Sequence, residues 1–192
     1  MRKAVIFLLI FCPLWAVSQR MHAHTVVDEH RKFTYTATGG VTTSYVGYFG
    51  DRFVPGQFTT LDGEAINPAD SAGCVFVYNF WFTACAPCVA EIPALNRVVE
   101  KFAGRRVYFV GIGWDAAPRL KAFLERRPYR FQIVSMSRDS IQALKKVDLY
   151  PFTLVADASG RVSFVVFGRP AVEDQEAIFG QLEAAVNKAI NQ

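Results

Sequence analysis

Two hydrophobic patterns follow one another near the middle of this chain. Residues 74–82 form a continuous apolar run, Cys-Val-Phe-Val-Tyr-Asn-Phe-Trp-Phe. The absence of alternation with polar residues predicts a strand buried on both faces, as in the centre of an α/β sheet. The next segment has apolar residues at helical spacing, which predicts a helix that begins near Cys85 and ends at Gly104. The residues of this apolar stripe are Val89, Ile92, Leu95, Val98, Val99 and Phe102.

The rest of the chain alternates between shorter strand-like and helix-like segments. We predict strands at residues 45–49, 57–61, 107–112, 131–134, 152–156 and 162–167, and helices at 118–127, 140–147 and 173–190. Residues 157–160, Asp-Ala-Ser-Gly, are typical of a hairpin turn between the last two strands. This order predicts one α/β domain over residues 45–192, with a central mixed sheet flanked by helices and a β-hairpin extension at its N-terminal end.

Residues 1–18 have the layout of a secretory signal peptide. Arg2 and Lys3 precede the apolar residues 4–17, and residues 16–18 offer the small side chains that signal peptidase recognises. The apolar stretch is shorter than the about 20 residues that span a bilayer. We therefore expect export to the periplasm with cleavage, and a retained N-terminal membrane anchor is the alternative.

Composition and charge narrow the class of protein. Hydrophobic residues make up 52% of the chain and charged residues 20%, which excludes a disordered chain and a charge-rich coiled coil. The net charge is +4 without a long basic run, so nucleic acid is not an expected partner. Residues 19–44 are polar and Thr-rich, and we predict that they form a mobile lead-in to the domain.

The three histidines, at positions 22, 24 and 30, all lie in this lead-in. A His-x-His pair could ligate a metal ion, but a solvated terminus is the interpretation that we prefer. Because no histidine follows residue 30, a Ser-His or Cys-His catalytic pair within the globular part is excluded.

Cys85 and Cys88 carry the candidate chemistry. Side chains three positions apart on a helix lie about 5–6 Å apart between Cβ atoms, which is close to disulfide range. The free N–H groups at a helix start stabilise a thiolate and can lower the pKa of a cysteine from about 8.5 to about 3.5–7.5. We expect an exposed Cys85 to attack a substrate disulfide and a more deeply placed Cys88 to resolve the mixed disulfide.

Other interpretations of the cysteines explain the pattern less well. A zinc site needs four ligands, and a second ligand pair is missing, so we expect no metal. A purely structural disulfide remains an alternative, although so short a loop constrains the unfolded chain little. Cys74 opens the predicted central strand, roughly 23 Å from Cys85 at the other end. It cannot pair with Cys85 within one molecule, and we expect a buried, inert thiol.

Residues 79–93, Asn-Phe-Trp-Phe-Thr-Ala-Cys-Ala-Pro-Cys-Val-Ala-Glu-Ile-Pro, resemble the active-site signature of thioredoxin-like proteins, and among these the exported TlpA/ResA type of thiol-disulfide oxidoreductase. The resemblance covers about residues 55–190. It implies a thioredoxin-like fold in which the helix and strand between about 116 and 135 form a central insertion. It also implies a cis-proline loop at Tyr150-Pro151 that faces a redox-active Cys85–Cys88 disulfide.

The resemblance also suggests roles for individual residues. Glu91 matches the family's acidic residue three positions after the second cysteine, and would carry a proton to or from Cys88 if burial raised its pKa. A solvent-facing helical glutamate is the alternative. Asn79 stands where thioredoxins have a buried Asp, and an amide cannot accept a proton at neutral pH. Ala84 stands where Trp commonly precedes the first cysteine. The expected substrate contacts are Trp81, Ala86, Pro87, Tyr150 and Pro151.

Together these features predict a monomeric, periplasmic thiol-disulfide oxidoreductase without a cofactor. Ala86-Pro87 place no cation between the cysteines, which favours a reductant over an oxidant. The resemblance implies that the substrates are cysteine-containing exported proteins, among them apocytochrome c, and that a membrane electron donor of thiol-disulfide type restores the dithiol. One alternative is a thiol peroxidase, although Thr83 lies two residues before Cys85 and not three. A redox-linked copper carrier is the other, although the distant histidine of such carriers is missing.

Overall fold

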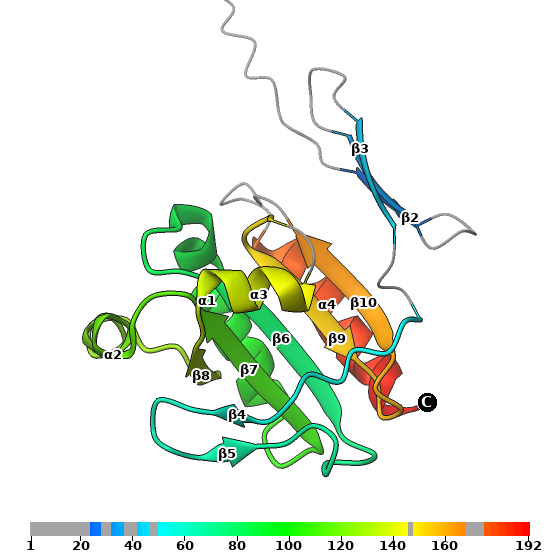
Figure 1. The fold of residues 1–192 in the computed structure, drawn as a ribbon. Helices are drawn as coiled ribbons and strands as arrows, with labels where there is room; N and C mark the ends of the chain where they lie inside the picture. Colours follow the sequence, from blue (N-terminus) through cyan, green and yellow to red (C-terminus); the bar gives the residue numbers. More distant parts are fainter. Residues whose placement is uncertain (1–23, 28–31, 37–41, 47–49, 146–147, 168–174) are drawn as a thin grey trace, which may run out of the picture.

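A computed structural model gives the fold of the chain (Figure 1). The structure describes residues 24–27, 32–36, 42–46, 50–145, 148–167 and 175–192. The predicted signal peptide, residues 1–18, lies outside these ranges, as do residues 47–49 of the first predicted strand. In the part of the chain that is described, no helix is long and apolar enough to cross a bilayer.

A five-stranded mixed sheet forms the centre of the domain, in the order β10-β9-β6-β7-β8 (Figure 1). Its strands are β6 (Val75–Trp81), β7 (Val107–Gly113), β8 (Gln132–Ser135), β9 (Phe152–Ala156) and β10 (Val162–Phe167). β6, β7 and β8 run parallel, whereas β9 and β10 are antiparallel to their neighbours. The predicted mixed sheet with an antiparallel edge is therefore confirmed.

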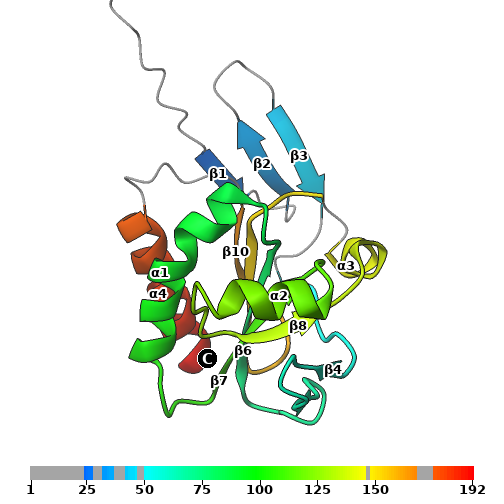
Figure 2. The same ribbon diagram turned by 90° about the vertical axis from the view of Figure 1, so that its left-hand side faces the viewer.

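Helices cover both faces of this sheet (Figure 2). The helices are α1 (Ala86–Lys101), α2 (Ala117–Leu124), α3 (Arg138–Lys145) and α4 (Gln175–Ile190). Every residue of β6 is buried, and its side chains alternate between two clusters: Tyr78 and Phe80 join Ile141 of α3, and Val77 joins the residues under α1 and α4. Burial of each such side chain contributes about 1.5–3 kcal/mol, which explains why the central strand carries no alternation.

The helix boundaries follow local capping chemistry. α1 ends near Gly104, which has a φ of 76°, as predicted for a glycine that terminates a helix. α2 ends three residues earlier than the predicted 118–127, because the backbone N–H groups of Arg126 and Arg127 both bond the Phe123 carbonyl and Pro128 follows. α3 begins earlier than predicted, since the Ser137 hydroxyl caps it by accepting from the Ser140 N–H.

Residues 19–44, the predicted lead-in, contain secondary structure that we did not predict. The structure describes three strands there and just after, β1 (His24–Val27), β2 (Lys32–Thr36) and β3 (Thr42–Val46), paired as an antiparallel sheet. Threonine, valine and tyrosine favour strands because they are β-branched or aromatic. The polar character of threonine by itself does not indicate these strands.

The pairing of the predicted strands 45–49 and 57–61 was wrong, because β3 pairs with β2 and the strand within 57–61 has another partner. β4 (Phe58–Thr59) pairs with β5 (Ala65–Ile66), for which we predicted no strand. The turn between them is closed by the Thr60 N–H, which donates to the Glu64 carbonyl at 2.9 Å. Phe58 and Ile66 are buried in the same cluster as Tyr78, so the hairpin covers part of the α3 face.

Candidate active site

The two cysteines lie where the central strand passes into the first helix. Cys85 is the N-cap of α1, with φ −80° and ψ 95°, and Cys88 lies in the first turn. They form a disulfide with a Cα–Cα distance of 5.2 Å, as expected. The Sγ atom of Cys85 accepts a hydrogen bond from the Cys88 N–H at 3.2 Å. Cys85 thus takes the capping role that Ser, Thr or Asp usually fills, and the same N–H can stabilise a thiolate after reduction.

The expectation that Cys85 is exposed was wrong for the disulfide form. Cys85 is 5% exposed and Cys88 is 1% exposed. Both belong to the buried cluster under α1, against which the partly buried Phe82 and Tyr150 pack. Ala84 and Ala86 on either side of Cys85 are exposed, so the disulfide lies just below a surface of small side chains, with Cys85 nearer to solvent.

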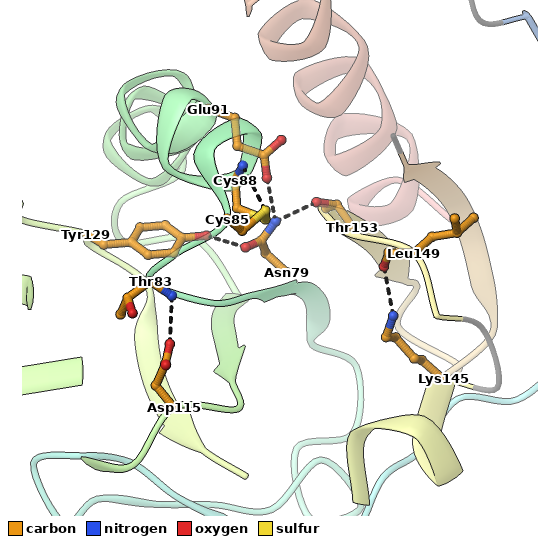
Figure 3. The surroundings of a disulfide bond; sticks show 10 residues. All are labelled: Asn79, Thr83, Cys85, Cys88, Glu91, Asp115, Tyr129, Lys145, Leu149 and Thr153. Atoms are coloured by element: carbon orange, nitrogen blue, oxygen red, sulfur yellow. Dashed lines mark hydrogen bonds between the residues drawn. A yellow bond between two sulfur atoms is a disulfide. The ribbon is translucent and has the colours of Figure 1, made fainter. Parts of the chain in front are cut away.

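Asn79 is the centre of a buried hydrogen-bond network beside the disulfide (Figure 3). Its Nδ2 donates to Oε1 of Glu91 at 2.8 Å and to Oγ1 of Thr153 at 2.9 Å. Its Oδ1 accepts from the Tyr129 hydroxyl at 3.0 Å. Both amide protons and the amide oxygen therefore have partners. The Asn79 amide, which cannot titrate, therefore links α1 and β9 to the segment before β8.

Glu91 is buried, so the solvent-facing alternative is excluded. The side chain is 4% exposed and comes one helical turn after Cys88, on the same side of α1. Burial raises its pKa to about 8, and the hydrogen bond from Asn79 opposes that rise. The carboxyl group consequently changes protonation state close to neutral pH, where thiols also titrate.

Tyr129 was not singled out from the sequence, and its contact with Asn79 offers a test of the network. In Tyr129→Phe the Asn79 Oδ1 atom would lose its hydrogen-bond donor inside the core. We expect the free energy of unfolding to fall by about 1–3 kcal/mol, measured by urea denaturation. Tyr108→Phe is the matched control, because Tyr108 is only partly buried, and it should change stability by no more than about 0.5 kcal/mol. Equal effects of the two substitutions would contradict the network.

The Tyr150-Pro151 peptide bond is cis, as the resemblance implied. Pro151 is buried, and Tyr150 is half-buried. The Tyr150 ring meets Phe82 edge-on at 5.5 Å and Trp114 at 4.6 Å between ring centroids. Phe82 directly precedes the turn that leads to Cys85, so this aromatic group connects the proline loop to the cysteine motif.

The substrate contact expected for Trp81 was wrong. Trp81 is 1% exposed and packs in the core against Phe123 of α2 and against Tyr129, with ring centroids 5.3 and 5.4 Å apart. It is the last residue of a strand that is buried on both faces, so its indole cannot contact a substrate. The expected contacts Ala86, Pro87 and Tyr150 are exposed or half-buried, whereas Pro151 is buried.

The start of α2 is tied to the cysteine motif by a polar network that the sequence did not reveal. The Thr83 N–H donates to Oδ2 of Asp115 at 2.6 Å, and the Arg119 Nε donates to Oγ1 of Thr83 at 2.9 Å. Asp115 and Arg119 also form an ion pair at 3.3 Å. These residues are more than 30 positions from Thr83 along the chain, so no local signal indicates the contact.

Cys74 lies far from this site, as predicted. It precedes β6, at the opposite end of the strand from Cys85, and it is a free thiol. The expectation of complete burial was wrong, since the residue is partly exposed and lines a cavity of about 480 Å³. Arg105 and Arg106 line the same cavity.

The sheet order and the disulfide at the start of α1 define the chain as a thioredoxin-like protein. The profile of the AhpC/TSA family matches residues 49–165, and the chain belongs to that family. The chain is 31% identical to the thiol-disulfide oxidoreductase ResA of Geobacillus kaustophilus over 120 residues. This alignment covers 62% of this chain and 68% of the relative.

Two solved structures are similar over most of the domain. One is a thiol:disulfide interchange protein of the thioredoxin family from Chlorobium tepidum, with 27% identity and a TM-score of 0.58 over 73% of this chain and 98% of that one. The other is a secreted disulfide oxidoreductase of Mycobacterium tuberculosis, homologous to E. coli DsbE, with 26% identity and a TM-score of 0.57 over 69% and 94%. The predicted fold and the predicted enzyme class, a thiol-disulfide oxidoreductase, are therefore confirmed.

Proposed function

We propose that this protein is an exported, periplasmic reductant of disulfides in other exported proteins, acting through its Cys-Ala-Pro-Cys motif. The observation that carries the proposal is the position of Cys85 at the N-cap of α1, with a resolving cysteine and a buried carboxyl group on the next turn. The residues between the two cysteines are uncharged, which supports a reducing potential because no cation there stabilises the thiolate.

The reaction begins with the reduced protein. The Cys85 thiolate attacks one sulfur of a substrate disulfide, which forms a mixed disulfide and releases the other substrate sulfur as a thiolate that takes up a proton. Cys88 then loses its proton and attacks the Cys85 sulfur, so that the second substrate sulfur leaves as a thiolate that also takes up a proton. The substrate gains two electrons and two protons, and the protein ends with the Cys85–Cys88 disulfide.

Glu91 serves in this scheme as the proton carrier for Cys88. With a pKa raised to about 8 by burial, a fraction of the group is ionised at neutral pH and can accept the Cys88 proton. The protonated form can return that proton when the disulfide is reduced again. Asn79 holds the carboxyl group by its hydrogen bond and cannot take the proton itself, so the proton stays with Glu91 or the thiol.

Export and substrate choice rest on separate arguments. A signal-like N-terminus and similarity to a secreted oxidoreductase support a periplasmic location. The substrate that the ResA-type resemblance favours is apocytochrome c in its disulfide form, which this reaction would return to thiols. Because each turnover leaves the protein oxidised, a membrane electron donor of thiol-disulfide type must supply two electrons per cycle.

Trapping of mixed disulfides tests this function. Cys88→Ala cannot resolve the intermediate, so exported cysteine-containing proteins should remain attached to Cys85 in periplasmic extracts and separate on reduction. Equilibration with thiol buffers should give a potential more negative than about −200 mV, on the reducing side of protein disulfide isomerase at about −180 mV. A potential near the about −120 mV of a strong oxidant, or the absence of any protein trapped on Cys85, would contradict the proposal.

A further inference from the structure

Lys145 is a buried cation close to the proline loop. It is the last residue of α3, and its side chain is 0% exposed. Taking an ammonium group out of water costs several kcal/mol unless other groups replace the water. A lysine is therefore rarely buried without a specific set of partners, and the partners of Lys145 indicate what it does.

These partners are a backbone carbonyl and the faces of aromatic rings. The Nζ atom donates to the carbonyl oxygen of Leu149 at 2.8 Å (Figure 3). It also lies 3.6 Å from the centroid of the Tyr150 ring and 5.5 Å from that of Phe152. An ammonium group over an aromatic face is attracted by the electrons of the ring, and more strongly when it is desolvated. These three contacts are made to the segment that contains the cis bond before Pro151 and the start of β9, and a more distant one, at 6.0 Å, is made to the Phe80 ring of β6.

Neither of the charged side chains near Lys145 is its hydrogen-bond partner. Asp148 attracts Lys145 and Arg138 repels it, but Oδ2 of Asp148 accepts from the Arg138 guanidinium at 2.8 Å. Arg138 in turn lies over the Trp114 ring at 4.9 Å. Asp148 and Arg138 thus form an exposed ion pair with each other. Lys145 instead binds the loop through the Leu149 carbonyl.

The loop segment that Lys145 holds is the part of the site that flanks the cysteines. The Tyr150 ring has Nζ over its face and forms a T-shaped contact with the Phe82 ring, which precedes the cysteines. The Leu149 carbonyl immediately precedes Tyr150. Movement of this segment would therefore displace both the aromatic contact to the motif and the extended backbone beside which a substrate strand can pair.

We propose that Lys145 is a positioning residue for polypeptide substrates, which sets the loop before Pro151 by binding the Leu149 carbonyl and the Tyr150 ring. The inference rests on thiol-disulfide exchange by Cys85 and Cys88, and not on the direction of electron flow or on the cellular substrate. A polypeptide substrate uses the loop, whereas a small thiol needs only access to the disulfide. Loss of the ammonium group should consequently slow the reaction with polypeptide substrates and leave the reaction with small thiols unchanged.

The test is Lys145→Met, which replaces the ammonium group with an apolar side chain of similar length. The substitution removes a buried charge but leaves the Leu149 carbonyl without its donor, so thermal unfolding must first show that the variant is folded. With an oxidised synthetic peptide as substrate, we expect KM to rise roughly tenfold at an unchanged kcat, the factor that corresponds to one lost charged hydrogen bond. The rate at which dithiothreitol reduces the Cys85–Cys88 disulfide should stay within about twofold.

Two further variants complete the design. Lys145→Gln keeps an N–H donor and should give an intermediate KM, and it serves as the main test if the methionine variant fails to fold. Lys121→Met alters an exposed lysine of α2 and should leave both assays unchanged. An unaltered KM for the peptide in both Lys145 variants, or an equal loss in the peptide and dithiothreitol assays, would overturn the proposal. Absence of peptide turnover in the unaltered protein would instead count against its function as an oxidoreductase of polypeptides.

Discussion

Cys85→Ser should reduce disulfide exchange by at least roughly a thousandfold, because the covalent step then has no sulfur to attack the substrate. The measurement is turnover of an oxidised peptide with dithiothreitol as the electron source. The fold should survive, since a serine hydroxyl can accept the hydrogen bond that the Cys88 N–H now donates to Sγ. The lost disulfide closes a loop with a sequence separation of only 3, so its effect on the unfolded chain is small.

Cys74→Ser provides the matched control for this substitution. Cys74 is a partly exposed free thiol at the far end of β6, so its replacement should leave turnover within about twofold of the unaltered protein. Retention of a tenth or more of the activity by Cys85→Ser would show that another group attacks the substrate. A large loss in Cys74→Ser would show that the distal thiol takes part.

Glu91→Gln should slow turnover near neutral pH by about a hundredfold, the lower range for loss of a positioned acid or base. In the unaltered protein, the resolving step should accelerate with rising pH and level off above about pH 8, where Glu91 becomes ionised. The amide keeps the size of the side chain but cannot carry a proton. A rate profile with the same inflection in both proteins would remove Glu91 from the mechanism.

Glu91→Gln should also change how the stability of the fold depends on pH. The Glu91 pKa is about 8 in the folded protein against 4.5 in the unfolded chain, so between these values the folded state binds one more proton. The free energy of unfolding therefore falls by up to about 1.4 kcal/mol per pH unit as the pH rises through this window, and this contribution is gone above about pH 8. Relative to the unaltered protein, Glu91→Gln should be more stable at pH 9 than at pH 5. Parallel pH dependences of urea unfolding would contradict the buried carboxyl group.

The features set by local sequence could be predicted. The unbroken apolar run of β6, the cysteine pair at a helix start and the glycine after α1 each follow from a pattern within a few residues. The cis bond before Pro151 and the burial of Glu91 came from the family resemblance, since neither has a local signal. The strands at residues 24–46 were missed because threonine is both a polar residue and a strong strand former.

Contacts between distant segments could not be predicted. Asn79 reaches Tyr129 and Thr153, which are 50 and 74 positions away in the sequence, and only the folded sheet brings them together. The burial of Lys145 has no signal either, because lysine at a helix end usually lies in solvent near the carbonyl groups. The depth of Cys85 likewise depends on aromatic side chains from separate loops.

The central claim is that Cys85, at the start of α1, is the sulfur that attacks. The rate of alkylation of the reduced protein as a function of pH, with the modified residue identified by mass spectrometry, tests it most directly. The structure predicts that Cys85 is modified before Cys88, with a midpoint clearly below the about 8.5 of an ordinary cysteine. Modification of Cys88 first, or a Cys85 midpoint at or above that of an ordinary cysteine, would contradict the claim.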